Sequence, residues 1–125
     1  MSPTSSVLRF GLPDATQPLN LSTCACILAR ASIDIDIDID DNKDVMKIRP
    51  YTPISTNALV GSFDLLVKNY GDNGIMSRHL CETIQVGDSI DFKHIEPNVK
   101  IQAPFSQKKI CMLTGGTGIT PMIQA

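Results

Sequence analysis

Glycine, proline and aspartate divide the chain into short runs of strand length, and this spacing limits the folds that are open to it. In the clearest run, Phe63, Leu65 and Val67 alternate with more polar residues and would share one face of a strand. Short strands separated by turn residues indicate an antiparallel barrel or sandwich. We therefore predict a mainly β fold, with strands within residues 6–10, 22–31, 61–69 and 89–94.

One complete helix interrupts this pattern. Met76, Leu80 and Ile84 recur at helical spacing within residues 75–84, and glycines stand on both sides of the segment. Near the end of the chain, an apolar run over 108–113 predicts a further strand, followed by a glycine-rich turn and a helix opened by Pro121.

The composition is that of a globular protein with one core. The chain has 125 residues, of which 42% are hydrophobic and 19% charged, and its net charge of −2 argues against a nucleic-acid partner. It lacks an apolar run of membrane-spanning length and a signal peptide, so we predict a soluble domain whose partner is a small molecule or a protein.

The four cysteines lack C-x-x-C spacing. We predict that all are buried free thiols rather than a disulfide framework. Cys24 and Cys26 would share one face of a strand, which leaves a redox pair open but gives poor disulfide geometry.

The stretch SIDIDIDIDD over residues 32–41 is the most unusual part of the sequence. Its alternation is typical of a strand, but the aspartates would repel one another on one face, so we predict a solvated acidic insertion over 32–42. A calcium loop is the alternative, and it fits poorly because the glycine and glutamate positions that such a loop requires hold other residues. We predict no metal site.

Three further segments carry residues suited to a nucleotide. RPYTPIS (49–55) combines a cation, an aromatic ring and hydroxyls, and GIMS (74–77) starts a helix with free backbone N–H groups. Each alone is more typical of ordinary structure. The third segment, GGTGITP (115–121), is a phosphate-binding type of turn with Thr120 as the expected N-cap, but Pro121 stands where the dinucleotide fingerprint has its third glycine. A related but distinct nucleotide fold is indicated.

Together these motifs resemble the NADH-cytochrome b5 reductases, within the ferredoxin-NADP reductase-like flavoproteins. The resemblance is close over residues 49–125 and looser over 7–31. It implies an antiparallel six-stranded-type flavin-binding barrel with one helix over 1–107, whose first strand is missing, followed by the truncated start of an α/β nicotinamide-binding domain over 108–125. The sequence would then be a fragment of a longer enzyme.

The resemblance also implies roles for individual residues. Thr52 would place its hydroxyl near the hydride-accepting atom of the flavin, and Lys68 would meet the nicotinamide nucleotide, so these two are the expected catalytic residues. Arg49 would pair with the FAD pyrophosphate. The expected cofactor-binding residues are Arg49, Pro50, Tyr51, Thr52, Leu66, Lys68, Tyr70, Gly74, Met76, Ser77, Gly115, Gly116, Gly118 and Thr120.

The implied function is transfer of hydride from NADH to FAD, followed by electron transfer to cytochrome b5 or a similar heme protein. The alternatives are the flavin module of a larger enzyme such as nitrate reductase, and a non-catalytic flavin- or ion-binding fragment. Family members face the cytosol at the endoplasmic reticulum or mitochondrial outer membrane, which would require peripheral association through segments absent here. One departure from the family is that Ile75 replaces a usual basic residue. His94 is expected to be a surface or hydrogen-bonded strand residue rather than a site residue.

Overall fold

A computed structural model of the chain describes residues 4–34, 45–95 and 107–124. Five strands and several short helical segments follow one another along these residues. The strands are β1 (Ser5–Gly11), β2 (Ile27–Ile33), β3 (Val45–Tyr51), β4 (Ser62–Lys68) and β5 (Asp91–His94). The helical segments are η1 (Gly71–Asn73), α1 (Ile75–Arg78), η2 (His79–Thr83), η3 (Gly116–Gly118) and α2 (Ile119–Gln124).

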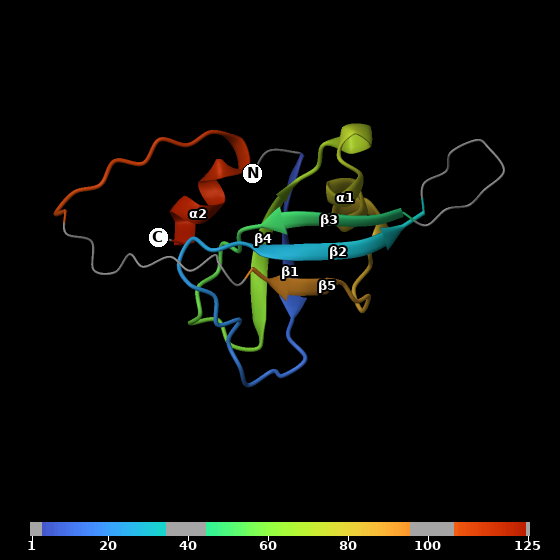
Figure 1. Cartoon of the computed structure of the whole chain (residues 1–125), viewed down its shortest axis with the longest axis horizontal. Coiled ribbons are helices and arrows are strands. Elements are labelled where there is room, and N and C mark those ends of the chain that lie inside the picture. The colour runs from blue at the N-terminus through green and yellow to red at the C-terminus, as the bar shows by residue number, and fades with distance from the viewer. Residues whose placement is uncertain (1–3, 35–44, 96–106, 125) are drawn as a thin grey trace.

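The strands form two antiparallel sheets, which confirms the expected mainly β fold. One sheet pairs β1 with β4, and the other has the order β3-β2-β5 (Figure 1). In the three-stranded sheet, Ala29 at the centre of β2 faces Arg49 of β3 on one side and Phe92 of β5 on the other. This register places the C-terminal end of β3, with Arg49 to Tyr51, next to the largely buried start of β2.

Three phenylalanines join the two sheets. Phe10 of β1 and Phe63 of β4 stack with ring centroids 5.6 Å apart, and Phe92 of β5 meets both edge-on at 4.9 and 5.0 Å. The predicted alternation in β4 is confirmed, since Phe63, Leu65 and Val67 are all buried while their neighbours are partly exposed. The core therefore lies between the sheets.

The predicted helix is confirmed with a change in its last turn. Residues 75–78 are α-helical and His79–Thr83 continue as a π-helical turn, so the helical path ends one residue before Ile84. Met76 and Leu80 are buried, and Ile84 packs against the core. The helix lies beside β2 and β3 and covers one end of the three-stranded sheet (Figure 1).

The strand predicted over 22–31 begins only at Ile27. Cys24 has a left-handed backbone with φ of 61°, which a strand does not accommodate, and a turn runs through this region. Cys24 and Cys26 therefore do not share one strand face. None of the four cysteines forms a disulfide, as predicted, but none is buried: Cys111 is exposed and the other three are half-buried.

The strand predicted over 108–113 is also absent. These residues have no regular structure and are exposed, with Leu113 at 91%, because no strand of the described chain lies beside them to complete a ladder. After them, Thr120 is not the N-cap that we expected. Helix α2 begins at Ile119, and the Thr120 hydroxyl donates to the Thr117 carbonyl oxygen at 3.0 Å inside the first turn.

The acidic stretch singled out in the sequence falls largely outside the described residues. Of the acidic stretch, only Ser32, Ile33 and Asp34 are described, and Ile33 is buried at the end of β2. The predicted solvated insertion is therefore wrong at its first two residues, since Ser32 and Ile33 belong to β2. The rest of the insertion after Asp34, and most of the calcium alternative, lie outside the described residues. His94 is exposed at the end of β5, as expected of a surface histidine. None of the described helices has the length and apolar character that crossing a membrane requires.

Candidate flavin-binding site

Strand β3 carries the first part of the site, and Arg49 is its most informative residue. The chain has four arginines, and within its described part Arg9, Arg30 and Arg78 each form an ion pair with an aspartate. Arg49 instead donates from Nη1 to the adjacent Ile48 carbonyl oxygen at 2.8 Å. A guanidinium left without an acidic partner beside a pocket is suited to an anionic ligand.

That pocket lies between β3 and the start of the helix. It has a volume of about 260 Å³, and we call it the cationic pocket. Its two charged lining residues, Lys47 and Arg49, are both positive. The full lining is Lys47, Arg49, Tyr70, Asn73, Gly74, Ile75, Met76 and Ser77.

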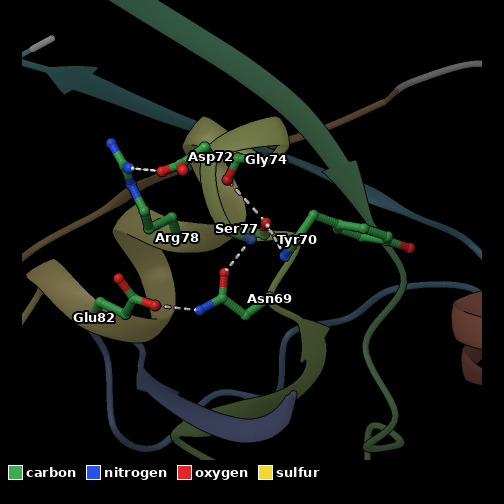
Figure 2. Close-up of polar contacts among 8 residues, drawn as sticks. Asn69, Tyr70, Asp72, Gly74, Ser77, Arg78 and Glu82 are labelled. Atoms are coloured by element: carbon green, nitrogen blue, oxygen red, sulfur yellow. Dashed lines mark hydrogen bonds and ion pairs between the residues drawn. The ribbon is translucent and has the colours of Figure 1, made fainter.

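A network of side chains holds the loop at the floor of this pocket (Figure 2). Asn69 accepts from the backbone N–H of Gly71 at 2.9 Å and donates to Glu82 Oε1 at 2.6 Å. Arg78 pairs with Asp72 at 2.5 Å across the same loop. These contacts tie the loop to the following helix at several points, so the lining residues are positioned before any ligand arrives.

Ser77 connects the loop to the helix start. Its hydroxyl donates to the Gly74 carbonyl oxygen at 2.9 Å and accepts from the Tyr70 backbone N–H at 3.3 Å (Figure 2). The hydroxyl of Ser77, one of the expected cofactor-binding residues, is therefore engaged within the protein. The backbone N–H groups of the first helical turn remain available for an anion.

Gly74 is required here by space. A Cβ at this position would lie 2.6 Å from Tyr70 Cβ and would also collide with the Ser77 hydroxyl. Glycine thus permits the close approach that brings Tyr70 and Ser77 together.

A second pocket adjoins the first. It has a volume of about 470 Å³, and we call it the tyrosine pocket. Tyr70 and Ser77 line both pockets, so the two pockets lie side by side, and together we call them the groove. The lining comes from β3, β4 and the glycine turn: Cys26, Pro50, Tyr51, Thr52, Leu66, Lys68, Tyr70, Ser77, Thr117, Gly118, Thr120 and Pro121.

The burial of Tyr51 and the position of Lys68 determine the electrostatics of the tyrosine pocket. Burial raises the pKa of Tyr51 to about 12, so its hydroxyl stays protonated and can donate a hydrogen bond at any physiological pH. Lys68 Nζ lies 5.2 Å from the centroid of the Tyr70 ring, within cation–π range. The pocket therefore offers flat apolar surfaces with one cation at its edge.

The glycine turn closes the tyrosine pocket from the other side. Gln124 of α2 accepts a short hydrogen bond from the Cys24 N–H and donates to the Ser55 carbonyl oxygen at 3.1 Å. Cys24 Sγ in turn donates to the Pro121 carbonyl oxygen at 3.2 Å. A six-residue helix would not be stable alone, but here tertiary contacts hold it and bury Thr120 to 7% exposure.

Most of the residues predicted for a cofactor site come together in this groove. Arg49, Gly74, Met76 and Ser77 line the cationic pocket, and Pro50, Thr52, Leu66, Lys68 and others line the tyrosine pocket. Gly115 and Gly116 line neither. Sequence reasoning missed Lys47, Asn73, Cys26, Thr117 and Pro121, and it treated Ile75, which also lines the cationic pocket, only as a departure from the family.

Lys47 alone among the missed residues had a sequence signal, because it lies two positions before Arg49 and must share its side of β3.

The groove fits FAD on the evidence of its own residues. A pyrophosphate needs cations and backbone donors, which the cationic pocket provides, and a planar ring system needs flat surfaces, which Pro50, Tyr51 and Leu66 provide in the adjoining pocket. The FAD-binding domain of oxidoreductases matches residues 1–101 of the chain as a family profile. The chain belongs to this family.

Individual members of the reductase family are similar over nearly the whole chain. NADH-cytochrome b5 reductase 1 of Lodderomyces elongisporus is 41% identical over 124 residues, which cover 99% of this chain and 37% of the relative. An NADH-cytochrome b5 reductase-like protein of Arabidopsis thaliana is 38% identical, covering 99% of this chain and 36% of the relative. The expected resemblance to NADH-cytochrome b5 reductases is confirmed.

A solved structure of this family shows the same fold. The cytochrome b5 reductase domain of Ulva prolifera nitrate reductase matches with a TM-score of 0.73 and 28% identity, covering 99% of this chain and 51% of that one. The chain thus spans little more than a third of the curated relatives named above, consistent with the expected fragment.

No group of three or more His, Cys, Asp or Glu in the described residues lies close enough together to hold a metal ion.

Proposed function

We propose that the chain is the FAD-binding part of an oxidoreductase that takes hydride from NADH and delivers electrons to cytochrome b5 or a similar heme protein. The groove supports this most directly, because a cationic pocket for a pyrophosphate opens into a tyrosine pocket whose far wall is the glycine turn. In the finer form of the proposal, the five strands belong to a six-stranded-type flavin barrel over 1–107, and residues 108–125 begin a nicotinamide-binding domain.

Bound FAD would supply the redox chemistry, since it accepts hydride and can release electrons singly. The protein's part is to bind and orient. Arg49 and the first helical turn would hold the pyrophosphate, and Tyr51, Pro50 and Leu66 would pack on the ring system.

Thr52 and Lys68 are the residues that we assign to the reaction itself. Both line the tyrosine pocket together with Thr117, Gly118 and Thr120 of the glycine turn and α2. Thr52 would present its hydroxyl to the reactive edge of the flavin, and Lys68 would attract the anionic nicotinamide nucleotide. Thr120 would reach the flavin from the glycine turn.

One alternative has an observation in its favour. The solved relative is the cytochrome b5 reductase domain of a nitrate reductase, so the same domain also serves inside a larger electron-transfer enzyme. The two proposals share the flavin and the hydride donor and differ in the acceptor.

The test is anaerobic stopped-flow bleaching of the flavin absorbance by NADH. We expect the 125-residue chain loaded with FAD to bleach slowly, because a dinucleotide site is built on a βαβ unit and residues 108–113 pair with no described strand. A hybrid that continues into the next region of the Lodderomyces relative should bleach quickly. Slow bleaching by the hybrid would contradict the reductase proposal, and fast bleaching by the short chain would contradict the need for a second domain.

A further inference from the structure

The cationic pocket contains more positive charge than one phosphate group requires. Lys47 and Arg49 stand two residues apart on β3, so both side chains project to the same side, at backbone positions about 6–7 Å apart. No aspartate or glutamate accompanies them in the lining of this pocket. The pocket is therefore a site of concentrated positive charge.

Neither cation is neutralised within the described part of the chain. The ion pairs there join Arg9 to Asp64, Arg30 to Asp91, and Arg78 to Asp72. Two unpaired like charges at neighbouring same-side positions repel each other. A ligand with two negative charges would relieve this repulsion, whereas a singly charged ligand would leave part of it.

The order of residues along β3 decides which part of the ligand each cation meets. Pro50 and Tyr51 line the tyrosine pocket, Arg49 comes next, and Lys47 lies farther along the strand in the cationic pocket only. A dinucleotide whose flavin occupies the tyrosine pocket would thus pass Arg49 before it reaches Lys47.

We propose that Lys47 binds the phosphate of FAD that lies farther from the flavin, while Arg49 binds the nearer one. This assignment rests on the proposed function and adds a specificity residue to it. FMN carries only the nearer phosphate, so Lys47 is the residue that makes the groove prefer FAD over FMN.

Ile75 also lines the cationic pocket and contributes no charge. The helix side of the pocket therefore supplies backbone donors, and the strand side supplies both cations. A lysine introduced at position 75 would reach the same space from the opposite wall, which gives the proposal a direct rescue experiment.

The experiment measures FAD and FMN affinity by flavin fluorescence for the wild-type chain and for Lys47→Ala. We expect Lys47→Ala to weaken FAD binding about fivefold or more, the effect of a partly exposed charge contact, and FMN binding less than about twofold. Lys93→Ala is the matched control, because Lys93 is exposed on β5 at the opposite edge of the same sheet and lines neither pocket. It should change neither affinity.

Ile75→Lys in the Lys47→Ala background should recover most of the lost FAD affinity. Equal losses for FAD and FMN in Lys47→Ala would overturn the assignment to the farther phosphate, and unchanged FAD affinity would overturn the contact itself. A loss that Ile75→Lys does not repair would show that the pocket needs the shape of Lys47 rather than its charge, which also contradicts the proposal. If the wild-type chain binds neither flavin, the proposed function fails instead.

Discussion

At the residue scale, the key feature of the site is that Arg49 has no acidic partner within the described chain. Every other arginine in the described chain is paired with an aspartate, and Arg49 faces a pocket whose other charged residue is also basic. Arginine suits a pyrophosphate better than lysine does, because its planar fork makes two parallel hydrogen bonds.

We therefore expect Arg49→Ala to weaken FAD binding by about 1.5–3 kcal/mol, the usual cost of losing a charge-assisted partner. The measurement is a fluorescence titration with FAD. Arg30→Ala is the matched control, since Arg30 lies on the adjacent strand, is ion-paired with Asp91 and lines neither pocket. Equal losses in the two variants would show that arginine substitutions disturb the sheet and that Arg49 has no special role.

His79 gives a residue-scale prediction about stability. Its Nδ1 is buried without a hydrogen-bond partner in the described structure, and burial lowers the pKa of its imidazole below the ordinary value of 6.5, with Asp88 opposing the shift. The unfolded chain then binds the proton more readily than the folded chain. This contribution to stability is fully present above pH 6.5 and is lost as the pH falls through the lower folded pKa.

Urea unfolding at pH 7.5 and pH 5.5 would measure this effect. We expect the stability of the wild-type chain to fall over this interval by at most about 1.4 kcal/mol for each unit of pKa difference. His79→Gln should remove that part of the pH dependence, whereas His94→Gln, at the exposed end of β5, should preserve it. The same pH dependence in both variants would rule out His79 as its source.

At the scale of elements, the turn between β4 and the helix joins the two pockets. Tyr70 and Ser77 line both, and they meet only because Gly74 has no side chain. Gly74→Ala should lower the free energy of unfolding by about 1–3 kcal/mol, the cost of overpacking, and should also weaken FAD binding because both shared lining residues must move.

Gly11→Ala is the control for that substitution. A Cβ at Gly11 meets nothing within 4 Å, so its effect on stability should stay within about 0.5 kcal/mol. Thermal unfolding of both variants, with and without FAD, separates the two effects. An unfolding temperature and FAD affinity unchanged in Gly74→Ala would disprove the steric argument.

The sequence predicts an element well when the pattern that forms it lies within that segment, and poorly when distant contacts decide it. The alternation in β4 and the apolar spacing of Met76 and Leu80 are local patterns, and both segments form as predicted. The start of β2 could not be predicted, because the left-handed backbone at Cys24 lies inside an apolar run without a glycine. The 108–113 segment has strand composition, but no strand of the described residues lies beside it, which composition does not reveal.

The same distinction applies to the site. Motif residues such as Arg49 and Gly74 could be assigned from the resemblance, and the structure brings them into one groove. Lys47 escaped notice because it belongs to no motif and acquires its position from the strand alone. The docking of α2 was missed because Gln124 acts through contacts to Cys24 and Ser55, which are distant in the sequence.

At the scale of the whole molecule, two sheets and a short C-terminal helix enclose one groove. The phenylalanine cluster fixes the sheets to each other, so β3 and β4 present their pocket residues from a rigid framework. The glycine turn reaches the same pocket through the hydrogen bonds of Gln124. A ligand that fills the groove would thus contact residues from 26 to 121, and its binding should stabilise the folded chain.

The central claim is that this groove binds a flavin through its pyrophosphate. Equilibrium titration of the wild-type chain with FAD, FMN and riboflavin, followed by flavin fluorescence, tests it most directly. We expect saturable binding in the order FAD, then FMN, then riboflavin, because the cationic pocket would meet two, one and no phosphate groups respectively. Equal affinity for all three flavins, or no saturable binding of FAD, would contradict it.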